Sequence, residues 1–249
     1  IFALPPPPPV SVNMSLPRIF IVGAKRTPFG AFGGKLKKMT ATDLAVHSSK
    51  AAIAQANIAA EKVEETFMGN VIASSSDGAY LARHVALRSG MGVQTPALTL
   101  NRLCGSGFES VCLGAEAIQL GRINVALCGG TENMSQCPMT IDGISARWGA
   151  PLGAGLVAKD SLWSGLTDSY AKMPMGMTAE KLGAKYGITR EQCDEFALRS
   201  QNLTQQAQEA GVLSAEIASV DIKGKKGMET VDRDEHPRAN AQLKDMTKL

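Results

Sequence analysis

Cys104 stands where the sequence pattern changes from strand to helix. The apolar run at residues 97–100 is typical of a short buried strand. After the cysteine the pattern becomes helical, and one predicted face is formed by Phe108, Val111, Ala115 and Ile118. The first-turn N–H groups and the dipole of a helix stabilise an anion, so a thiol at this place ionises more easily than a free cysteine. The pattern therefore predicts a nucleophilic cysteine.

Gly105 and Gly107 flank this thiol, and without a Cβ atom they let a substrate approach the sulfur closely. The alternative is that Cys104 is an ordinary buried cysteine that only packs. The cysteines are odd in number and contain no CxxC pair, which favours free thiols in a reducing compartment over a disulfide framework. The five lie at positions 104, 112, 128, 137 and 193.

Composition describes an ordinary globular chain of one or two domains. It has 249 residues, 44% of them hydrophobic and 20% charged, with a net charge of +3. This charge is too small to indicate a nucleic-acid partner, and no apolar run approaches the ~18 residues of a membrane span. The three histidines are scattered, so no metal site is predicted.

The elements that must position Cys104 alternate along the chain. Strands are predicted at 18–24, 65–72, 97–100 and 124–128, with helices at 40–56, 80–89 and 106–121. This order predicts an α/β fold, a layered sheet with helices on its faces. Ligands of such sheets meet the carboxyl ends of the strands, where Cys104 and the pair Gly129–Gly130 fall. The glycine-rich loop at 25–34 lacks GxGxxG and is not predicted to hold phosphate. His84 is interpreted as a hydrogen-bonded packing residue.

The sequence pattern changes near residue 134. Helices are predicted at 178–186 and 190–210, the second with a Thr189–Gln192 capping box, and a hairpin at 217–232. The Lys-Gly-Lys-Lys cluster at 223–226 is a solvated turn or, alternatively, a phosphate contact. The expected organisation is a disordered, proline-rich leader at 1–15, an α/β domain at 16–133, and a mostly helical cap at 134–249 inserted over the sheet. The chain starts at Ile1, or its true start is Met14, and its end without a closing strand suggests truncation.

Two motifs carry a specific resemblance. Residues 101–108, Asn-Arg-Leu-Cys-Gly-Ser-Gly-Phe, resemble the acyl-enzyme signature of the thiolase family, and residues 128–135 resemble that family's turn after the following strand. Further matches at 24–30, 68–71, 80–85, 160–163, 175–180 and 234–236 are similar to the mitochondrial branch that cleaves 3-ketoacyl-CoA. The resemblance runs from about residue 16 to 249. It implies the N-terminal portion of a thiolase fold.

The resemblance also implies a chemistry. Cys104 attacks the keto carbon of a 3-ketoacyl-CoA, acetyl-CoA leaves, and the shortened acyl chain is held as a thioester until coenzyme A removes it. Met175 matches a residue that lines the pantetheine tunnel. Arg238 matches an arginine at the nucleotide end of coenzyme A, or it is a surface arginine beside an acidic run. Coenzyme A is expected as a substrate, with no permanently bound cofactor. The full-length form is expected to be a homodimer or homotetramer. The expected setting is mitochondrial fatty-acid β-oxidation, and cytoplasmic and peroxisomal locations are the alternatives.

The sequence also departs from the family pattern. A complete thiolase carries Asn-Glu-Ala-Phe, Gly-His-Pro and Cys-x-Gly-Gly-Gly motifs in a second half, and none of them occurs here. The chain alone is therefore expected to be inactive. Pro174 replaces a histidine of some acetoacetyl-CoA thiolases and favours the broader chain-length class. The alternatives are an acetyl-CoA acetyltransferase, a non-catalytic truncated subunit, and an unrelated cysteine hydrolase.

Overall fold

The centre of the molecule is a parallel sheet of three strands. The structure is a computed structural model that describes residues 16–224 and 227–246, so the predicted leader lies outside the described residues. The strands are β1 (Glu65–Gly69), β2 (Ala97–Leu100) and β3 (Ala126–Gly130), in the order β2-β1-β3. Phe67 of β1 lies opposite Leu98 of β2 and Cys128 of β3. This register brings the carboxyl ends of all three strands to one edge.

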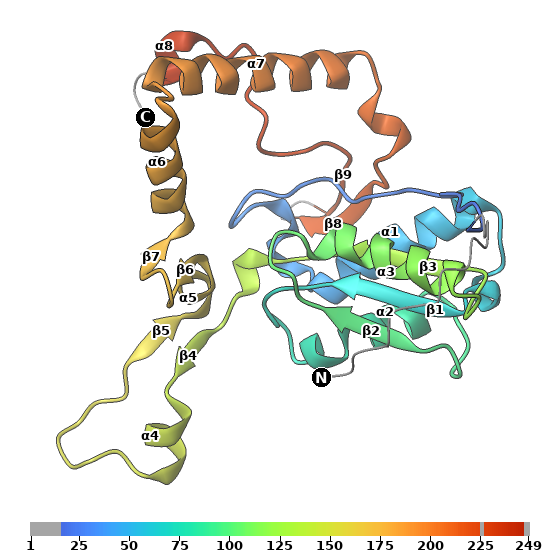
Figure 1. The fold of residues 1–249 in the computed structure, drawn as a ribbon, viewed down its shortest axis with the longest axis horizontal. Coiled ribbons are helices and arrows are strands. Elements are labelled where there is room, and N and C mark those ends of the chain that lie inside the picture. The colour runs from blue at the N-terminus through green and yellow to red at the C-terminus, as the bar shows by residue number, and fades with distance from the viewer. Residues whose placement is uncertain (1–15, 225–226, 247–249) are drawn as a thin grey trace, which may run out of the picture.

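Helices cover both faces of this sheet (Figure 1). Met68 points into a core that it shares with α1 (Ala41–Ala56) and α2 (Leu81–Arg88). Its neighbour Phe67 points to the other face, where it packs with Ala117 of α3 (Ser106–Gln119). Successive side chains of a strand alternate in this way, which is why one strand serves two cores. The predicted α/β layered fold is confirmed.

Local sequence explains where α1 begins and ends. Thr40 accepts a hydrogen bond from the Asp43 backbone N–H, and the Asp43 carboxylate accepts one from the Thr40 N–H, which makes the predicted capping box. The helix ends at Asn57, whose left-handed φ of 52° suits an asparagine. Thr189 and Gln192 form the second predicted capping box at the start of α7 (Arg190–Glu209).

The strand predicted at residues 18–24 is not formed. Phe20, Ile21 and Val22 are 69%, 78% and 62% exposed, and the segment pairs with no strand of the described chain. Nearby, Arg26 makes an isolated bridge to Ile217. An apolar run becomes a strand only where a neighbour supplies hydrogen-bond partners, and the described sheet supplies none here. The prediction of a central strand was therefore wrong for this structure.

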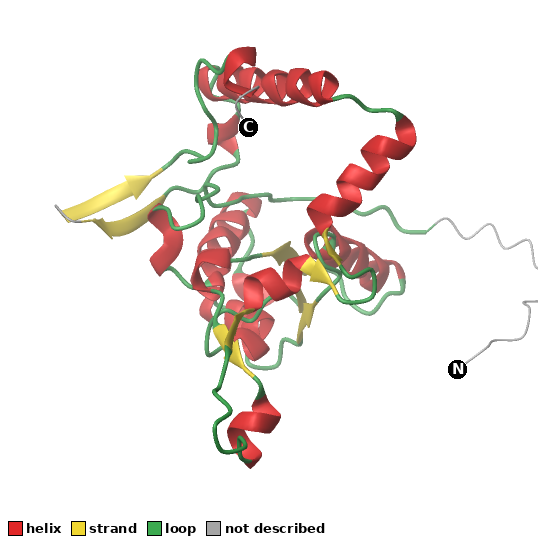
Figure 2. Cartoon of the chain, turned by 90° about the vertical axis from the view of Figure 1, so that its left-hand side faces the viewer, coloured by secondary structure: helices red, strands yellow, loops and turns green. Residues whose placement is uncertain are grey.

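Most of the second half of the chain extends away from the sheet (Figures 1 and 2). Within the described residues, the predicted helices 178–186 and 190–210 correspond to α6 (Met175–Tyr186) and α7, and the predicted hairpin corresponds to β8 (Val220–Gly224) and β9 (Gly227–Val231). We call residues 139–246 the arm, and the predicted cap over the sheet stays a prediction. The boundary at residue 134 stays a prediction. The elements of the arm are β4 (Met139–Ile141), α4 (Gly143–Trp148), β5 (Ala158–Asp160), α5 (Ser161–Leu166), β6 (Thr167–Asp168), β7 (Met173–Pro174), α6, α7, β8, β9 and α8 (Leu243–Met246).

The hairpin is the part of this arm that packs on the body. Val220 and Val231 share a small core with Leu36 and Leu44. No helix in the described ranges 16–224 and 227–246 is long and apolar enough to cross a membrane.

An ion-pair cluster reinforces this attachment. Arg26 donates two hydrogen bonds to Asp234, at 2.7 and 3.0 Å, and one to Glu216 at 2.7 Å. Burial disfavours the Asp234 carboxylate, but the hydrogen bonds from Arg26 and from the Phe29 N–H outweigh it and lower the pKa of Asp234. Glu235 accepts hydrogen bonds from backbone N–H groups of the loop at 31–35. Both ends of the segment 216–235 are thereby tied to the N-terminal loop.

Candidate active site

Cys104 lies in the turn that joins β2 to α3, two residues before the first helical residue. Its side chain is exposed, so the alternative of a buried packing cysteine is wrong. The fourteen-residue helix begins beside it, and the N–H groups of its first turn lack intrahelical partners. These groups and the helix dipole favour an anion at this place. The predicted strand–turn–helix junction is confirmed.

The turn itself is fixed by hydrogen bonds between its own residues. The Ser106 hydroxyl accepts from the Arg102 N–H at 2.8 Å and donates to the Leu103 carbonyl at 2.6 Å. The Gly105 N–H donates to the Arg102 carbonyl, and the Asn101 side chain accepts from the Leu103 N–H at 2.9 Å. Leu103 has a φ of +50°, a left-handed conformation that non-glycine residues seldom adopt. The backbone of the turn that carries Cys104 is therefore fixed by several hydrogen bonds at once.

Close approach between glycines and α3 brings the helix onto the carboxyl edge of the sheet. A Cβ atom on Gly69, the last residue of β1, would lie 2.7 Å from Ser106. A Cβ on Gly130, the last residue of β3, would lie 3.1 Å from the Cα of Gly107. A Cβ on Gly107 itself would meet open space. The missing Cβ atoms of Gly69 and Gly130 thus let the start of α3 lie against the strand ends, and the close approach of a substrate beside Gly105 and Gly107 stays a prediction.

The turn after β3 lies at the same edge. Its Glu132 carboxylate accepts hydrogen bonds from the Val71 N–H at 2.9 Å and from the Asn70 side chain at 3.0 Å. Burial raises the pKa of Glu132, while these N–H donors act in the opposite direction. The Thr131 hydroxyl donates to the Ala41 carbonyl at 2.7 Å, which ties the turn to α1. The predicted meeting of the Gly129–Gly130 turn with the carboxyl edge of the sheet is confirmed.

A second cysteine shows how different the environment of Cys104 is. Cys128 lies in β3 beneath α3, and burial raises the pKa of its thiol to about 11. A Cβ on Gly114 would stand 2.4 Å from the Cys128 sulfur, so Gly114 faces the sheet and lets α3 pack closely on β3. The outer face of α3 holds Phe108 and Val111, which are 63% and 44% exposed.

The histidines lie elsewhere. His84 hydrogen-bonds Asp77 at 3.1 Å and stacks on Tyr80, in line with its interpretation as a hydrogen-bonded packing residue. His47 lies within α1, and His236 follows β9. No hydrogen bond between a histidine and Cys104 occurs in the described part of the chain. A general base for the thiol is therefore not supplied by these three residues.

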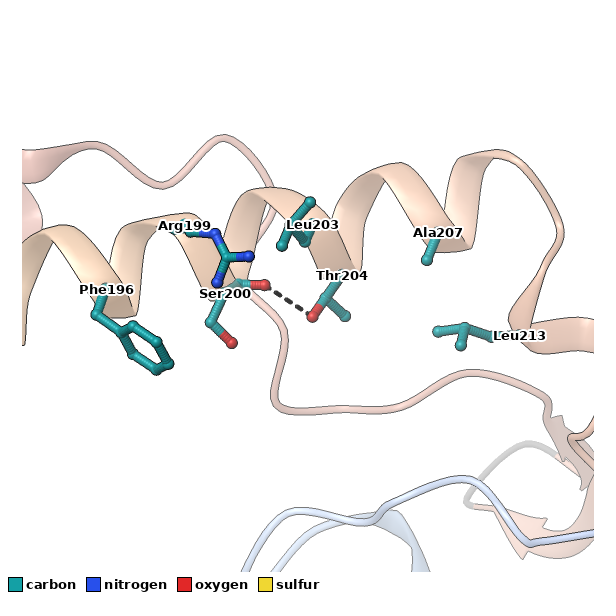
Figure 3. Close-up of a pocket in the computed structure, with 7 residues that line it drawn as sticks. All are labelled: Phe196, Arg199, Ser200, Leu203, Thr204, Ala207 and Leu213. Atoms are coloured by element: carbon teal, nitrogen blue, oxygen red, sulfur yellow. Dashed lines mark hydrogen bonds between the residues drawn. The ribbon is translucent and has the colours of Figure 1, made fainter.

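The other two predicted site residues belong to the outlying arm. Met175 is the first residue of α6 and is 48% exposed. Arg238 is exposed, and its backbone N–H donates to Gln201 of α7 at 2.8 Å. A hollow of about 290 Å³ runs along α7, between Phe196 and Leu213 (Figure 3). None of Cys104, Met175 and Arg238 lines it, so this hollow does not join the three predicted residues into one site.

Sequence reasoning did not identify the side chains that hold the turn. Asn101, Ser106 and Glu132 are polar residues inside the two quoted motifs, at fixed spacing from Cys104 and from Gly130. Their position within the two motifs was the signal that could have identified them. The partners of Ser106 lie in its own turn, whereas Asn101 and Glu132 also bond Val71 in the loop after β1, which the linear sequence does not pair with them.

Comparison with known proteins gives the wider context. The family model described as "Thiolase, N-terminal domain" matches residues 19–249. The chain is 50% identical to the mitochondrial 3-ketoacyl-CoA thiolase of Rattus norvegicus over 93% of its length, and 40% identical to the beta-ketothiolase BktB of Cupriavidus necator. It covers 58% of each of these proteins.

Solved structures agree with this match. The crystal structure of human mitochondrial 3-ketoacyl-CoA thiolase aligns with a TM-score of 0.89 at 49% identity, over 92% of this chain and 58% of that one. The same human protein in complex with CoA aligns with a TM-score of 0.87 at 48% identity, over 92% of this chain and 57% of that one. The chain thus spans a little under three fifths of the proteins it matches. By its family match, its sequence and its fold, the chain belongs to the thiolase family and contains that family's N-terminal domain.

Proposed function

We propose that this chain carries the acyl-accepting cysteine of a 3-ketoacyl-CoA thiolase. The observation that carries the proposal is the exposed Cys104 thiol at the N-terminus of α3, on the carboxyl edge of the sheet. A nucleophile presented in this way is accessible to a thioester substrate. The relatives named above support the class of reaction.

The proposed reaction has two steps. The Cys104 thiolate attacks the keto carbon of a 3-ketoacyl-CoA, and the bond between that carbon and the α-carbon breaks. The electron pair leaves with acetyl-CoA as its enolate, which takes up a proton. The thiolate of coenzyme A then attacks the acyl-cysteine and releases the shortened acyl-CoA and the free cysteine thiolate. No redox change occurs.

Coenzyme A is the second substrate in this proposal, and no group is bound permanently. A human relative was solved in complex with CoA. Met175 is proposed to contact the pantetheine arm and Arg238 the phosphates or adenine, because a guanidinium suits both groups. Both side chains lie on the arm, so the proposal requires coenzyme A to extend from the arm to the Cys104 turn.

Setting and partners are proposed from the relatives. The similar mammalian proteins are named as mitochondrial, so mitochondrial fatty-acid β-oxidation is the proposed setting. We propose a homodimer or homotetramer for the full-length protein. The histidines of this chain do not activate Cys104 in the structure, so we expect acyl loading without efficient turnover from this chain alone.

The test is acyl loading of the 249-residue chain. Incubation with octanoyl-CoA should transfer the octanoyl group to Cys104 and release coenzyme A, which intact-mass and peptide mass spectrometry detect. Cys104→Ser should abolish loading, whereas Cys193→Ser, which removes another exposed thiol, should not. Added coenzyme A should remove the acyl group. Loading of the Cys104→Ser variant at the parent rate, or no loading of the parent, contradicts the proposal.

The second candidate is an acetyl-CoA acetyltransferase, to which proteins similar to this chain also belong. It uses the same nucleophile, so acyl chain length distinguishes the two. Faster loading from octanoyl-CoA than from acetyl-CoA supports the 3-ketoacyl-CoA thiolase. Loading restricted to acetyl-CoA supports the acetyltransferase.

A further inference from the structure

The residue before the nucleophile is held in an unfavourable backbone conformation. Leu103 has a φ of +50°, and its side chain is 62% exposed, so burial of that side chain does not account for the conformation. Such conformations persist only where the surrounding structure over-determines them. The Leu103 N–H donates to the Asn101 side-chain oxygen at 2.9 Å. Asn101 is thus the side chain that holds the Leu103 peptide from its amino side.

Asn101 is itself held from a second strand. Its side-chain amide donates to the Val71 carbonyl at 3.2 Å, while its oxygen accepts from Leu103. Asn101 follows β2 and Val71 follows β1, so this one amide group joins two loops at the carboxyl edge. These two hydrogen bonds use both the N–H donor and the oxygen acceptor of the Asn101 amide, a combination that a carboxylate or a methyl group does not offer.

The third strand enters through Glu132. The other side of the Val71 residue, its N–H, donates to the Glu132 carboxylate at 2.9 Å, and the same carboxylate accepts from Asn70. Glu132 follows β3, so the loops after all three strands are linked in the order β3, β1, β2. The link ends at the peptide that precedes Cys104. Its members are Glu132, Val71, Asn101 and Leu103.

We propose that Asn101 and Glu132 are positioning residues for Cys104, which act through the Val71 backbone to hold the Leu103 turn. The inference rests on the proposed role of Cys104 as nucleophile, but its test does not use acyl-CoA. Loss of either side chain frees the turn to leave the conformation that presents the sulfur at the start of α3. A misplaced reacting atom loses rate even when the rest of the fold is intact.

The experiment measures alkylation of Cys104 by iodoacetamide in the full chain at pH 7, followed by peptide mass spectrometry. Cys193 is exposed on α7 and serves as the internal reference. We expect Asn101→Ala and Glu132→Gln each to lower the Cys104/Cys193 rate ratio at least about fivefold. The double variant should be little slower than the slower single variant, because residues of one network are not additive.

Two sets of variants separate positioning from general stability. Asn101→Asp keeps an acceptor for the Leu103 N–H but cannot donate to Val71, so its rate should lie between those of the parent and Asn101→Ala. The matched control is the Asn124–Glu64 pair, a similar hydrogen-bonded pair at the amino edge of the same sheet. Asn124→Ala and Glu64→Gln should leave the ratio unchanged.

Three results overturn the inference. These are changes of less than about twofold in both single variants, additive effects in the double variant, or an equal effect from the amino-edge control pair. Hydrogen exchange of the peptide that contains Leu103 provides a second readout, and it should accelerate in the positioning variants but not in the control variants. If the parent is alkylated quickly at Cys104 but accepts no acyl group, the proposed function fails while the positioning inference stands.

Discussion

Replacing Arg26 by glutamine should loosen the attachment of the 216–235 segment to the body. The Asp234 side chain is only 8% exposed, against 24% for that of Arg26, so the substitution leaves a nearly buried carboxylate without its ion-pair partner. Loss of one partner of a buried pair costs about 3–5 kcal/mol. Asp234 keeps its hydrogen bond from the Phe29 N–H at 2.7 Å, and Arg26 is partly solvated, so we expect about 2 kcal/mol.

The assay is equilibrium unfolding followed by circular dichroism. For a chain of this size, a loss of about 2 kcal/mol lowers the melting temperature by roughly 4–8 °C. The matched control is Lys35→Gln. The Lys35–Glu229 ion pair also joins the N-terminal loop to the hairpin, but both of its side chains are nearly half exposed. Solvent screens such a pair, so this variant should unfold like the parent.

The pH dependence identifies the carboxylate. The pKa of Asp234 is lowered in the folded protein, so its contribution to stability is fully present above the ordinary aspartate value of about 3.9. The contribution is lost as the pH falls through the lowered folded-state pKa. The difference between the parent and Arg26→Gln should therefore be constant from pH 7 to pH 5 and shrink below pH 4. Equal losses in Arg26→Gln and Lys35→Gln, or a difference that grows in acid, would refute this reasoning.

Three further predictions concern the Cys104 turn. Gly69→Ala should destabilise the fold by about 1–3 kcal/mol and slow alkylation of Cys104, because its Cβ would lie 2.7 Å from Ser106; unchanged melting and alkylation would contradict it. Leu103→Gly should stabilise the fold by about 0.5–1 kcal/mol in urea unfolding, since glycine adopts the φ of +50° without a Cβ penalty, and a loss of stability would contradict this. Cys128 should resist alkylation until the pH approaches about 11, because burial disfavours its thiolate; a pH series of peptide labelling checks this, with the exposed Cys193 as the reference for reagent access.

Local patterns sufficed for the elements around Cys104. The strand at 97–100 and the helix after Cys104 were predicted because apolar periodicity and a glycine-rich turn are encoded in adjacent residues. The capping boxes at Thr40 and Thr189 were predictable for the same reason, since each uses a side chain and a backbone group three residues apart.

Features that depend on distant partners were not predictable. The run at 18–24 has the composition of a strand, but its structure depends on whether a neighbour lies beside it, and periodicity carries no such information. Arg26 and Asp234 are separated by 208 positions, so their ion pair could not be inferred from spacing. Met175 and Arg238 were placed by resemblance alone, and their contacts with coenzyme A stay proposals.

The comparison of Cys104 with Cys128 shows what the fold contributes to the chemistry of a thiol. Both cysteines lie within a few residues of the carboxyl end of a strand in the same sheet. Cys128 is inside its strand and beneath α3, where burial disfavours the thiolate. Cys104 lies past the end of its strand, where Ser106 and Asn101 fix an exposed turn at the start of the helix. The residue type is therefore not what distinguishes the proposed nucleophile. A cysteine within a strand has a desolvated thiol, whereas a cysteine in the turn a few residues past the strand end has an accessible one. Lengthening or shortening the Cys104 turn should therefore remove the reactivity of Cys104 without replacing the cysteine itself.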